Sequence, residues 1–217
     1  MKSILCLWIG LSLCAQSGKL GIPQAESEPG FILGVHSGWV QLSHSDFDIP
    51  DFPQVETGRA SWQMDLAYQF RSMNQITLSW LQLGDWQGEK ERQIGAGQAH
   101  ATAIDLEWQI FALTYRESVK LTPHSEFFMA AGVYTLQESG EQTDRFTLRN
   151  GDREFVQEDQ TDLGRTTSDL VVSLGFSRPF KHWLFQGSYT YYSDLLDKSG
   201  SPFTPIQQLN LGIGYRF

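Results

Sequence analysis

The stretch Leu-Asn-Leu-Gly-Ile-Gly-Tyr-Arg-Phe, residues 209–217, closes the printed sequence and decides the fold. Its apolar residues occupy every second position, namely Leu209, Leu211, Ile213, Tyr215 and Phe217. A period of two predicts a β-strand with one apolar face. In a soluble sheet that face packs on a core, whereas in a transmembrane barrel it faces lipid.

Seven earlier segments also alternate, and together they predict an all-β protein, an eight-stranded antiparallel up-and-down transmembrane β-barrel. The most regular of them, residues 59–70, has six apolar residues at alternate positions, a length that crossing a membrane requires. Alternation breaks at Leu81 and Leu83, which predicts a bulge or the barrel rim, and again at 111–115. The predicted strands are residues 31–41, 59–70, 75–83, 102–117, 125–137, 166–177, 182–192 and 206–217.

The connections between these strands alternate in length. If both chain ends lie in the periplasm, all short turns fall on the periplasmic side and all long loops outside, as outer-membrane barrels are built. A hairpin is expected within the third long loop, at residues 144–157. The short turns are residues 71–74, 120–124 and 178–181, and the long loops are residues 43–57, 84–101, 138–165 and 193–205.

The first 17 residues have the layout of a signal peptide, with Lys2, an apolar run over 4–14 and small residues at the exit. Its removal would take away both cysteines, Cys6 and Cys14, and would leave 15 basic against 25 acidic residues, a net charge of −10. Lipid modification of Cys14 is the alternative. Residues 18–30 are expected to form a short periplasmic tail, and residues 31–217 the barrel domain.

Composition agrees with a barrel and excludes other classes. Aromatic residues make up 13% of the chain, and 20 Gly against 8 Pro favour many strands with tight turns. With a mean hydropathy of −0.30 and no long apolar run, helical membrane spans are excluded. The acidic balance argues against nucleic-acid binding.

Inward positions of the predicted strands carry polar side chains, and outward positions near the strand ends carry aromatic ones. The interior of an eight-stranded barrel is only wide enough for side chains, so we expect a paired polar network and no general diffusion. The predicted lumen network is His36, Arg59, Asp65, Asp105, Glu107, Asp169, Asn210 and Arg216. The predicted aromatic girdles are Trp39, Trp62, Trp80 and Trp108 on the outer side, and Tyr68, Phe70, Phe176 and Trp183 on the periplasmic side.

The sequence resembles the small eight-stranded outer-membrane proteins of Gram-negative bacteria, the group that includes the OmpA transmembrane domain and the OmpX-like barrels. The resemblance covers residues 31–217, and its most specific feature is residues 209–217, which look like the C-terminal signal that the outer-membrane assembly machinery recognises. It implies export to the outer membrane, contact with membrane lipid and lipopolysaccharide, and a monomer. The chain does not continue into a peptidoglycan-binding domain, so that role is not expected.

The leading functional hypothesis is a non-enzymatic outer-membrane barrel of structural or surface-interaction type, with no cofactor and no metal. The first alternative is a lipid A-modifying enzyme of the acylase or deacylase type, with His44, Ser45 and Asp46 as candidate catalytic residues. A second Ser/His cluster, at 124–126, falls on the periplasmic side. The second alternative is a soluble periplasmic lipocalin-like barrel. The acidic residues of the third loop match no EF-hand spacing; they are Glu154, Glu158, Asp159 and Asp162.

Overall fold

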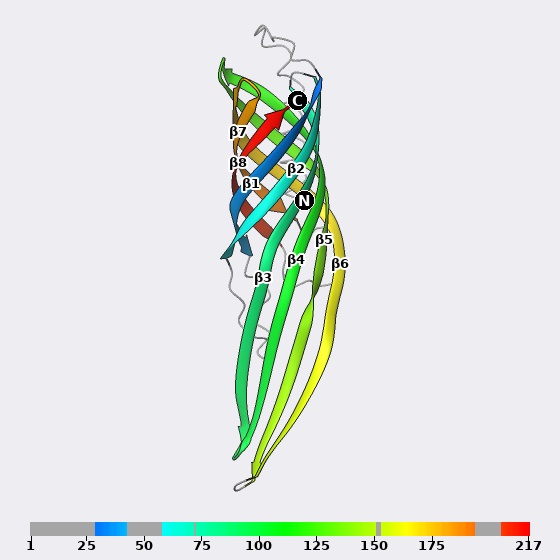
Figure 1. Cartoon of the computed structure of the whole chain (residues 1–217), viewed down its shortest axis with the longest axis vertical. Coiled ribbons are helices and arrows are strands. Elements are labelled where there is room, and N and C mark those ends of the chain that lie inside the picture. The colour runs from blue at the N-terminus through cyan, green and yellow to red at the C-terminus, as the bar shows by residue number, and fades with distance from the viewer. Residues whose placement is uncertain (1–28, 43–57, 72, 151–152, 194–204) are drawn as a thin grey trace, which may run out of the picture.

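The computed structural model is a closed antiparallel barrel of eight strands in chain order, which confirms the predicted fold class (Figure 1). The structure describes residues 29–42, 58–71, 73–150, 153–193 and 205–217. The strands are β1 (Gly30–Leu42), β2 (Gly58–Arg71), β3 (Asn74–Gly95), β4 (Gln98–Thr122), β5 (Ser125–Asn150), β6 (Arg153–Phe180), β7 (Trp183–Tyr192) and β8 (Ile206–Arg216).

The last strand closes the barrel, because β8 pairs with β7 on one side and with β1 on the other. Val35 lies opposite Ile213, and the backbone N–H of Phe217 donates to the carbonyl of Phe31 at 3.0 Å. Directly opposed residues share a face of the sheet. Leu209, Leu211 and the other alternating apolar residues of β8 therefore lie on the outer surface with those of β1.

Four of the strands are about twice as long as the others. β3, β4, β5 and β6 have 22, 25, 26 and 28 residues, whereas β1, β2, β7 and β8 have 10 to 14. Beyond the barrel these four continue as a curved four-stranded sheet, which we call the arm (Figure 1). The predicted long loops at residues 84–101 and 138–165 are therefore wrong: both are hairpins of the arm, and the hairpin expected at 144–157 lies inside the second.

The apolar side of β3 and β4 changes face along each strand. In β4, Phe111, Leu113 and Tyr115 are exposed on the outer surface. Beyond them the apolar residues turn inward, and Ile104, Leu106, Trp108 and Ile110 are buried. β3 changes at the matching position, because outward Trp80 pairs with Phe111 and buried Leu81 pairs with Ile110.

This change of face corrects the predicted facing of residues 104–110 in β4. Ile104, Leu106, Trp108 and Ile110 face the interior, and Asp105 and Glu107 face outward. The strand itself runs on without a register shift there. Its surroundings change instead: an outer face that touches lipid must be apolar, whereas one that touches water must be polar.

The predicted bulge lies in β3. Between Gln82 and Asp85 the β3 strand has one residue more than β4, and Gly84 adopts a left-handed φ of 79°. A bulge of this kind tightens the local twist of the sheet. It lies where β3 leaves the barrel and enters the arm.

Candidate functional site: a sealed lumen and an extracellular arm

An apolar layer fills the barrel interior on the side of the arm. Four of its side chains are completely buried and pack in one cluster; they are Leu81, Leu83, Trp108 and Ile110. Tyr134 and Tyr192 belong to the same cluster, with ring centroids 5.1 Å apart in a T-shaped contact. The remaining members of the cluster are Val40, Ile104, Leu106, Ala112, Leu136, Val171 and Ile206. We call this layer the plug.

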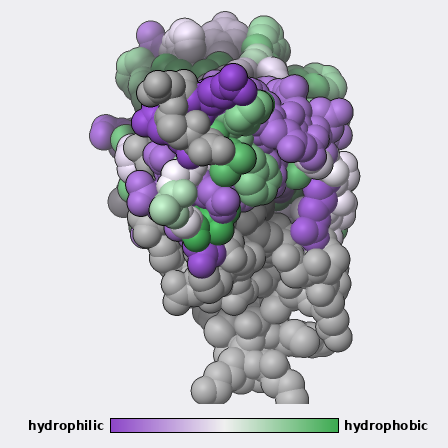
Figure 2. Space-filling view, turned by 90° about the horizontal axis from the view of Figure 1, so that it is seen from below, coloured by the Kyte–Doolittle hydropathy of each residue, from purple (hydrophilic) through white to green (hydrophobic). Residues whose placement is uncertain are grey.

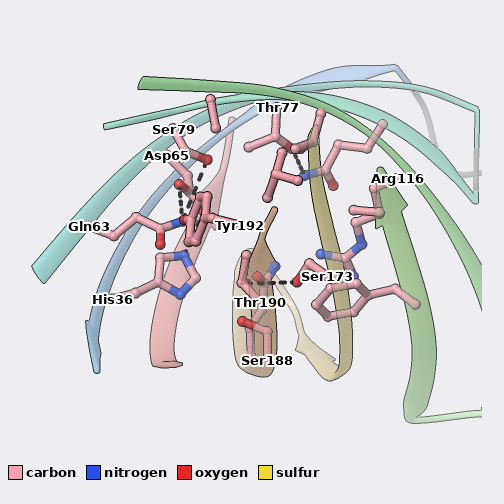
Figure 3. A pocket seen from close by; sticks show the side chains of 17 residues that line it. His36, Gln63, Asp65, Thr77, Ser79, Arg116, Ser173, Ser188, Thr190 and Tyr192 are labelled. Atoms are coloured by element: carbon pink, nitrogen blue, oxygen red, sulfur yellow. Dashed lines mark hydrogen bonds and ion pairs between the residues drawn. The ribbon is translucent and has the colours of Figure 1, made fainter. Parts of the chain in front are cut away.

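A small polar cavity of about 60 Å³ lies in the lumen next to the plug (Figure 3). Its walls carry His36, Gln63, Asp65, Arg116 and several hydroxyl groups. One water needs roughly 10–15 Å³ on this measure, so the cavity has room for only a handful of waters. This volume is too small for a drug-sized or lipid ligand.

A hydrogen-bonded cluster joins β1, β2 and β8 beside the cavity, and Figure 3 shows its members His36, Gln63 and Asp65. His36 Nε2 lies 2.9 Å from Asp65 Oδ2, and Gln63 Nε2 donates to Asp65 Oδ1 at 2.7 Å. Asn210 Nδ2 donates to Gln63 Oε1 at 3.2 Å. The His36 ring fits because β8 has a glycine beside it: a Cβ on Gly212 would overlap the ring at Nδ1.

Arg116 is the main lumen residue that the sequence prediction missed. Its guanidinium is buried, donates to Ser118 Oγ at 3.2 Å and to Ser177 Oγ at 2.8 Å, and stacks 3.7 Å above the ring centroid of Phe128. Continuing the period of two along β4 from Ala112 would have placed it inward. The apparent parity break at 111–115 hid that signal.

The other predicted lumen residues divide into two groups. Asp169 is buried and accepts hydrogen bonds from Ser193 Oγ and from the backbone N–H of Leu170, while Arg216 donates to Gln69 at 2.6 Å. Arg59 lies on the same face of β2 as Asp65. Asp105 and Glu107 lie outside the lumen, where they accept hydrogen bonds from the β3 side chains Gln87 and Gln82.

Hydrogen bonds and ion pairs in the described lumen join neighbouring strands of the barrel. His36 lies against Gly212, where a Cβ would come within 2.0 Å of His36 Nδ1. The candidate residues His44, Ser45 and Asp46 lie outside the described residues. In the part of the chain that the structure describes, no group of three or more His, Cys, Asp or Glu side chains is arranged to hold a metal ion.

Aromatic rings surround the barrel at the end of the short turns. Phe31 contacts Tyr68 at 5.0 Å between ring centroids, and Phe127 contacts Phe176 at 5.3 Å. Trp183 contacts Tyr215 at 5.0 Å. Phe70 lies 6.3 Å from Tyr115, and Tyr215 5.1 Å from Phe217. Near the arm, the exposed Trp39 and the T-shaped pair Trp62 and Trp80 lie on the outer surface, whereas the predicted girdle residue Trp108 is inside the plug.

Away from the plug, the barrel has an apolar exterior around a polar interior, which is the construction of a transmembrane β-barrel of the outer membrane. A soluble lipocalin-like barrel would need the opposite arrangement. The three short turns mark the periplasmic end, so the arm projects from the extracellular end. No helix in the described ranges is long and apolar enough to cross a membrane.

A second polar cluster lies on the arm, between β4 and β5. Asp144 Oδ1 accepts hydrogen bonds from Thr102 Oγ1 at 2.7 Å and lies 3.1 Å from His100 Nε2, while Gln142 donates to Oδ2 at 2.8 Å. The His100 ring stacks on Phe146 at 4.2 Å. The hydrogen bond from Thr102, followed by those from Gln142 and His100, holds the pKa of Asp144 below its ordinary value of 3.8 against the opposing effect of burial.

Comparison with known proteins finds similar solved structures. No family model and no curated protein matches the sequence. Among solved structures, Ail of Yersinia pestis, in complex with the heparin analogue sucrose octasulfate, is 16% identical with a TM-score of 0.43, covering 90% of this chain and 100% of that one. Neisserial surface protein A is 12% identical with a TM-score of 0.49, covering 89% of this chain and 100% of that one. The outer membrane protein OprG from Pseudomonas aeruginosa is 9% identical with a TM-score of 0.44, covering 88% of this chain and 98% of that one. At these identities the similarity extends no further than the barrel fold.

The lumen network predicts different outcomes for two substitutions of Asp65. Asp65→Asn keeps an acceptor for Gln63 and offers a donor to His36, so the free energy of unfolding should fall by less than about 1 kcal/mol. Asp65→Leu removes an acceptor from both partners in the interior and should cost about 2 kcal/mol or more. Urea unfolding of the reconstituted protein, followed by gel mobility, measures both. Equal damage from the two variants would mean that the carboxylate charge itself is needed.

The lowered pKa of Asp144 predicts an arm that loosens in acid. Because the folded-state pKa lies below the unfolded one, the stabilisation is fully present above about pH 4 and is lost as the pH falls through the folded value. Hydrogen exchange in β4 and β5 of the arm, corrected for the intrinsic rate, should accelerate there. Asp144→Asn should show the faster exchange already at pH 7; protection equal to wild type at pH 7 would contradict this role.

Proposed function

We propose that the protein acts in surface interaction, with the barrel as a membrane anchor for the extracellular arm, and that it is not an enzyme. The observation that carries this proposal is the unequal length of the strands. Because β3 to β6 continue past the plug while the other four strands stop near it, the sheet outside the membrane presents a folded surface. A barrel with a purely structural role within the membrane would not need a folded sheet outside it.

The sealed lumen supports the same proposal. The plug fills the interior next to the arm, and the cavity beside it has room for only a handful of waters. Passage of a solute would require the plug to move or unfold. Recognition outside the membrane is therefore favoured over transport.

The arm offers two edges as well as two faces. β3 pairs with β2 no further than Gln82, and β6 pairs with β7 no earlier than Val171. Within the described ranges, the distal parts of these strands therefore have a strand neighbour on one side only. Such edges favour contact with another chain, and proteins commonly restrain this with charge.

The outer face of the arm is strongly acidic. On this face the acidic residues are Asp85, Glu89, Glu91, Asp105, Glu107, Glu141, Glu154, Glu158 and Asp162, against Arg145 and Arg149. Lipopolysaccharide is the lipid expected around the extracellular end, and its phosphates are negative. Like charges repel, so the acidic face favours an arm that stands away from its own membrane.

A variant with a shortened arm tests the proposal. Residues 89–103 and 143–160 are each replaced by a short turn, which removes the outer part of the arm and leaves the plug and barrel. The barrel should still reach the outer membrane and shift its gel mobility on heating. Cells that express the wild-type protein should adhere to host cells or matrix-coated wells above the empty-vector level, and cells with the short-arm variant should not.

Equal amounts of both proteins in the outer membrane, measured by immunoblot, control for expression. Full adhesion by the short-arm variant would overturn the proposal.

A further inference from the structure

The arm carries a groove near its end. The groove has a volume of about 280 Å³ and is bordered by four large apolar side chains that are 43–59% exposed. Figure 2, which looks along the arm toward the barrel, shows hydrophobic residues next to strongly hydrophilic ones. The four side chains are Ile94, Phe146, Leu148 and Phe155. This part of the arm is therefore unusually apolar for an exposed surface.

The part of the arm between this groove and the barrel, which we call the shaft, is acidic. It has Lys90 and Arg165 against eleven acidic residues. Two shafts therefore repel each other unless opposite charges are brought together. The shaft comprises residues 83–91, 101–110, 138–144 and 158–165. Its acidic residues are Asp85, Glu89, Glu91, Asp105, Glu107, Glu138, Glu141, Asp144, Glu158, Asp159 and Asp162.

Strand parity places the groove on the inner face of the arm, the face that continues the barrel interior. Buried Ile104 faces the interior, and Gln98, six residues away on β4, lies on the same side. Leu148 is the register partner of Gln98, and Phe155 is the partner of Leu148, so both share that face. Phe146 is two residues from Leu148 on β5 and shares it too.

A row of charged residues crosses the inner face between the groove and the plug. Lys90, Thr102, Asp144 and Asp159 are register partners on β3, β4, β5 and β6. The row therefore has a cation on the β3 edge of the arm and a carboxylate on the β6 edge. In the middle, Asp144 accepts hydrogen bonds from Thr102 and Gln142.

The membrane limits how two copies of the arm can meet. Both barrels lie at the same depth, so equal heights on the two arms meet, and a closed pair needs a two-fold axis along the membrane normal. With the inner faces together, this axis sets β3 of one copy opposite β6 of the other. Lys90 of each copy then faces Asp159 of the other copy, and the apolar residues of the two grooves lie together.

The shape of the arm carries its inner face beyond the short strands. Lys90 is eight residues past Gln82, the last residue of β3 that pairs with β2, so at about 3.3 Å per residue it lies about 26 Å beyond that point. Figure 1 shows that the arm is curved and that its end lies below β7 and β8 in this view. In the ring of eight strands, β7 and β8 stand opposite β3 and β4. The arm therefore bends toward its own inner face.

We propose that two copies of the protein in the same membrane pair through the inner faces of their arms. Burial of the apolar groove residues supplies the attraction. The two contacts between Lys90 and Asp159 fix the orientation, since charge pairs at a contact select the partner and its register more than they add affinity. The pair replaces the monomer that the family resemblance implies, and it forms whether or not the arm binds a host surface.

The contact has the size of a weak complex. Residues 98–104 of β4 span about 20 Å, and four strands about 4.8 Å apart span about 19 Å, so each copy offers roughly 400 Å². Complexes of this size are weak in solution. Confinement of both copies to one membrane raises their effective concentration and favours the pair.

Other pairings of two copies bring like charges together. A two-fold axis across the strands, with the charged rows level, sets Lys90 against Lys90 and Asp159 against Asp159. Pairing through the outer faces brings together the acidic side chains of two shafts, such as Asp105 and Glu141. Repulsion of this kind disfavours both arrangements.

Energy transfer in proteoliposomes tests the pairing. His124→Cys, in protein purified from the outer membrane, puts a label on an exposed periplasmic turn far from the arm. Donor-labelled and acceptor-labelled copies are reconstituted together at low density. The protein with an unaltered arm should show transfer above the level of chance encounters, which the charge variants below report at the same density.

An exchange of charges tests the orientation. Lys90→Glu alone or Asp159→Lys alone sets like charges opposite each other and should weaken the association by about tenfold. The double exchange, Lys90→Glu with Asp159→Lys, should restore it. Glu89→Gln with Glu158→Gln alters the neighbouring residues on the outer face and is the matched control, which should pair at least as well as wild type.

Carbodiimide coupling locates the contact, because it joins an amine to a carboxylate only when the two groups touch. Within one arm, Lys90 and Asp159 lie on opposite edges of a four-stranded sheet, about 14 Å apart. A coupled peptide of these two residues should therefore come from two copies. Mixing unlabelled with isotope-labelled protein before coupling shows by mass spectrometry whether it does.

The outcomes separate the pairing from the proposed surface role. Equal transfer for wild type and Lys90→Glu, or a double exchange that does not restore transfer, would overturn the pairing. The heat-dependent gel shift shows that each variant forms the barrel. Adhesion of cells without energy transfer would leave the surface role standing and reject the pair, whereas transfer without adhesion would do the reverse.

Discussion

The hydrogen-bond ladder between β1 and β8 is the interaction on which the rest of the molecule depends. In lipid no water is present to satisfy a backbone N–H or carbonyl, so a sheet can cross the membrane only when its first and last strands pair. Here that pairing runs from Ile32 opposite Arg216 to Leu42 opposite Ile206. Closure fixes which face of every strand is enclosed, and thereby places His36, Asp65 and Arg116 in one interior.

The second constraint is the change of solvent along each long strand. β3 and β4 pass from lipid to water without a break, and their apolar residues move from the outer face to the inner one at Trp80/Leu81 and Ile110/Phe111. The inward apolar residues build the plug and the polar outer residues build the shaft of the arm. The move of apolar residues from the outer to the inner face thus closes the lumen and leaves the outer face of the arm polar.

The sequence is sufficient to predict a strand and its facing where each face of the strand keeps the same environment along its whole length. Residues 59–70 and 209–217 keep one face in lipid and one in the lumen, so their alternation predicted strand, facing and barrel class together. It was insufficient for Asp105, Glu107, Trp108 and Arg116, because alternation shows two faces without saying which one is enclosed. The sequence predicts loops in place of the arm for a related reason: with water on its outer face and mixed residues on its inner face, the arm lacks the apolar stripe that indicates a strand.

Site-directed spin labelling along β4 tests the change of face most directly. Labels at 111, 113 and 115 should collide with oxygen dissolved in lipid, those at 103, 105 and 107 with a water-soluble nickel reagent, and those at 104, 106 and 108 with neither. Lipid exposure at 104, 106 or 108 would mean that the apolar face stays outward along the whole strand. The plug, the acidic shaft and the extracellular position of the arm would then all be wrong.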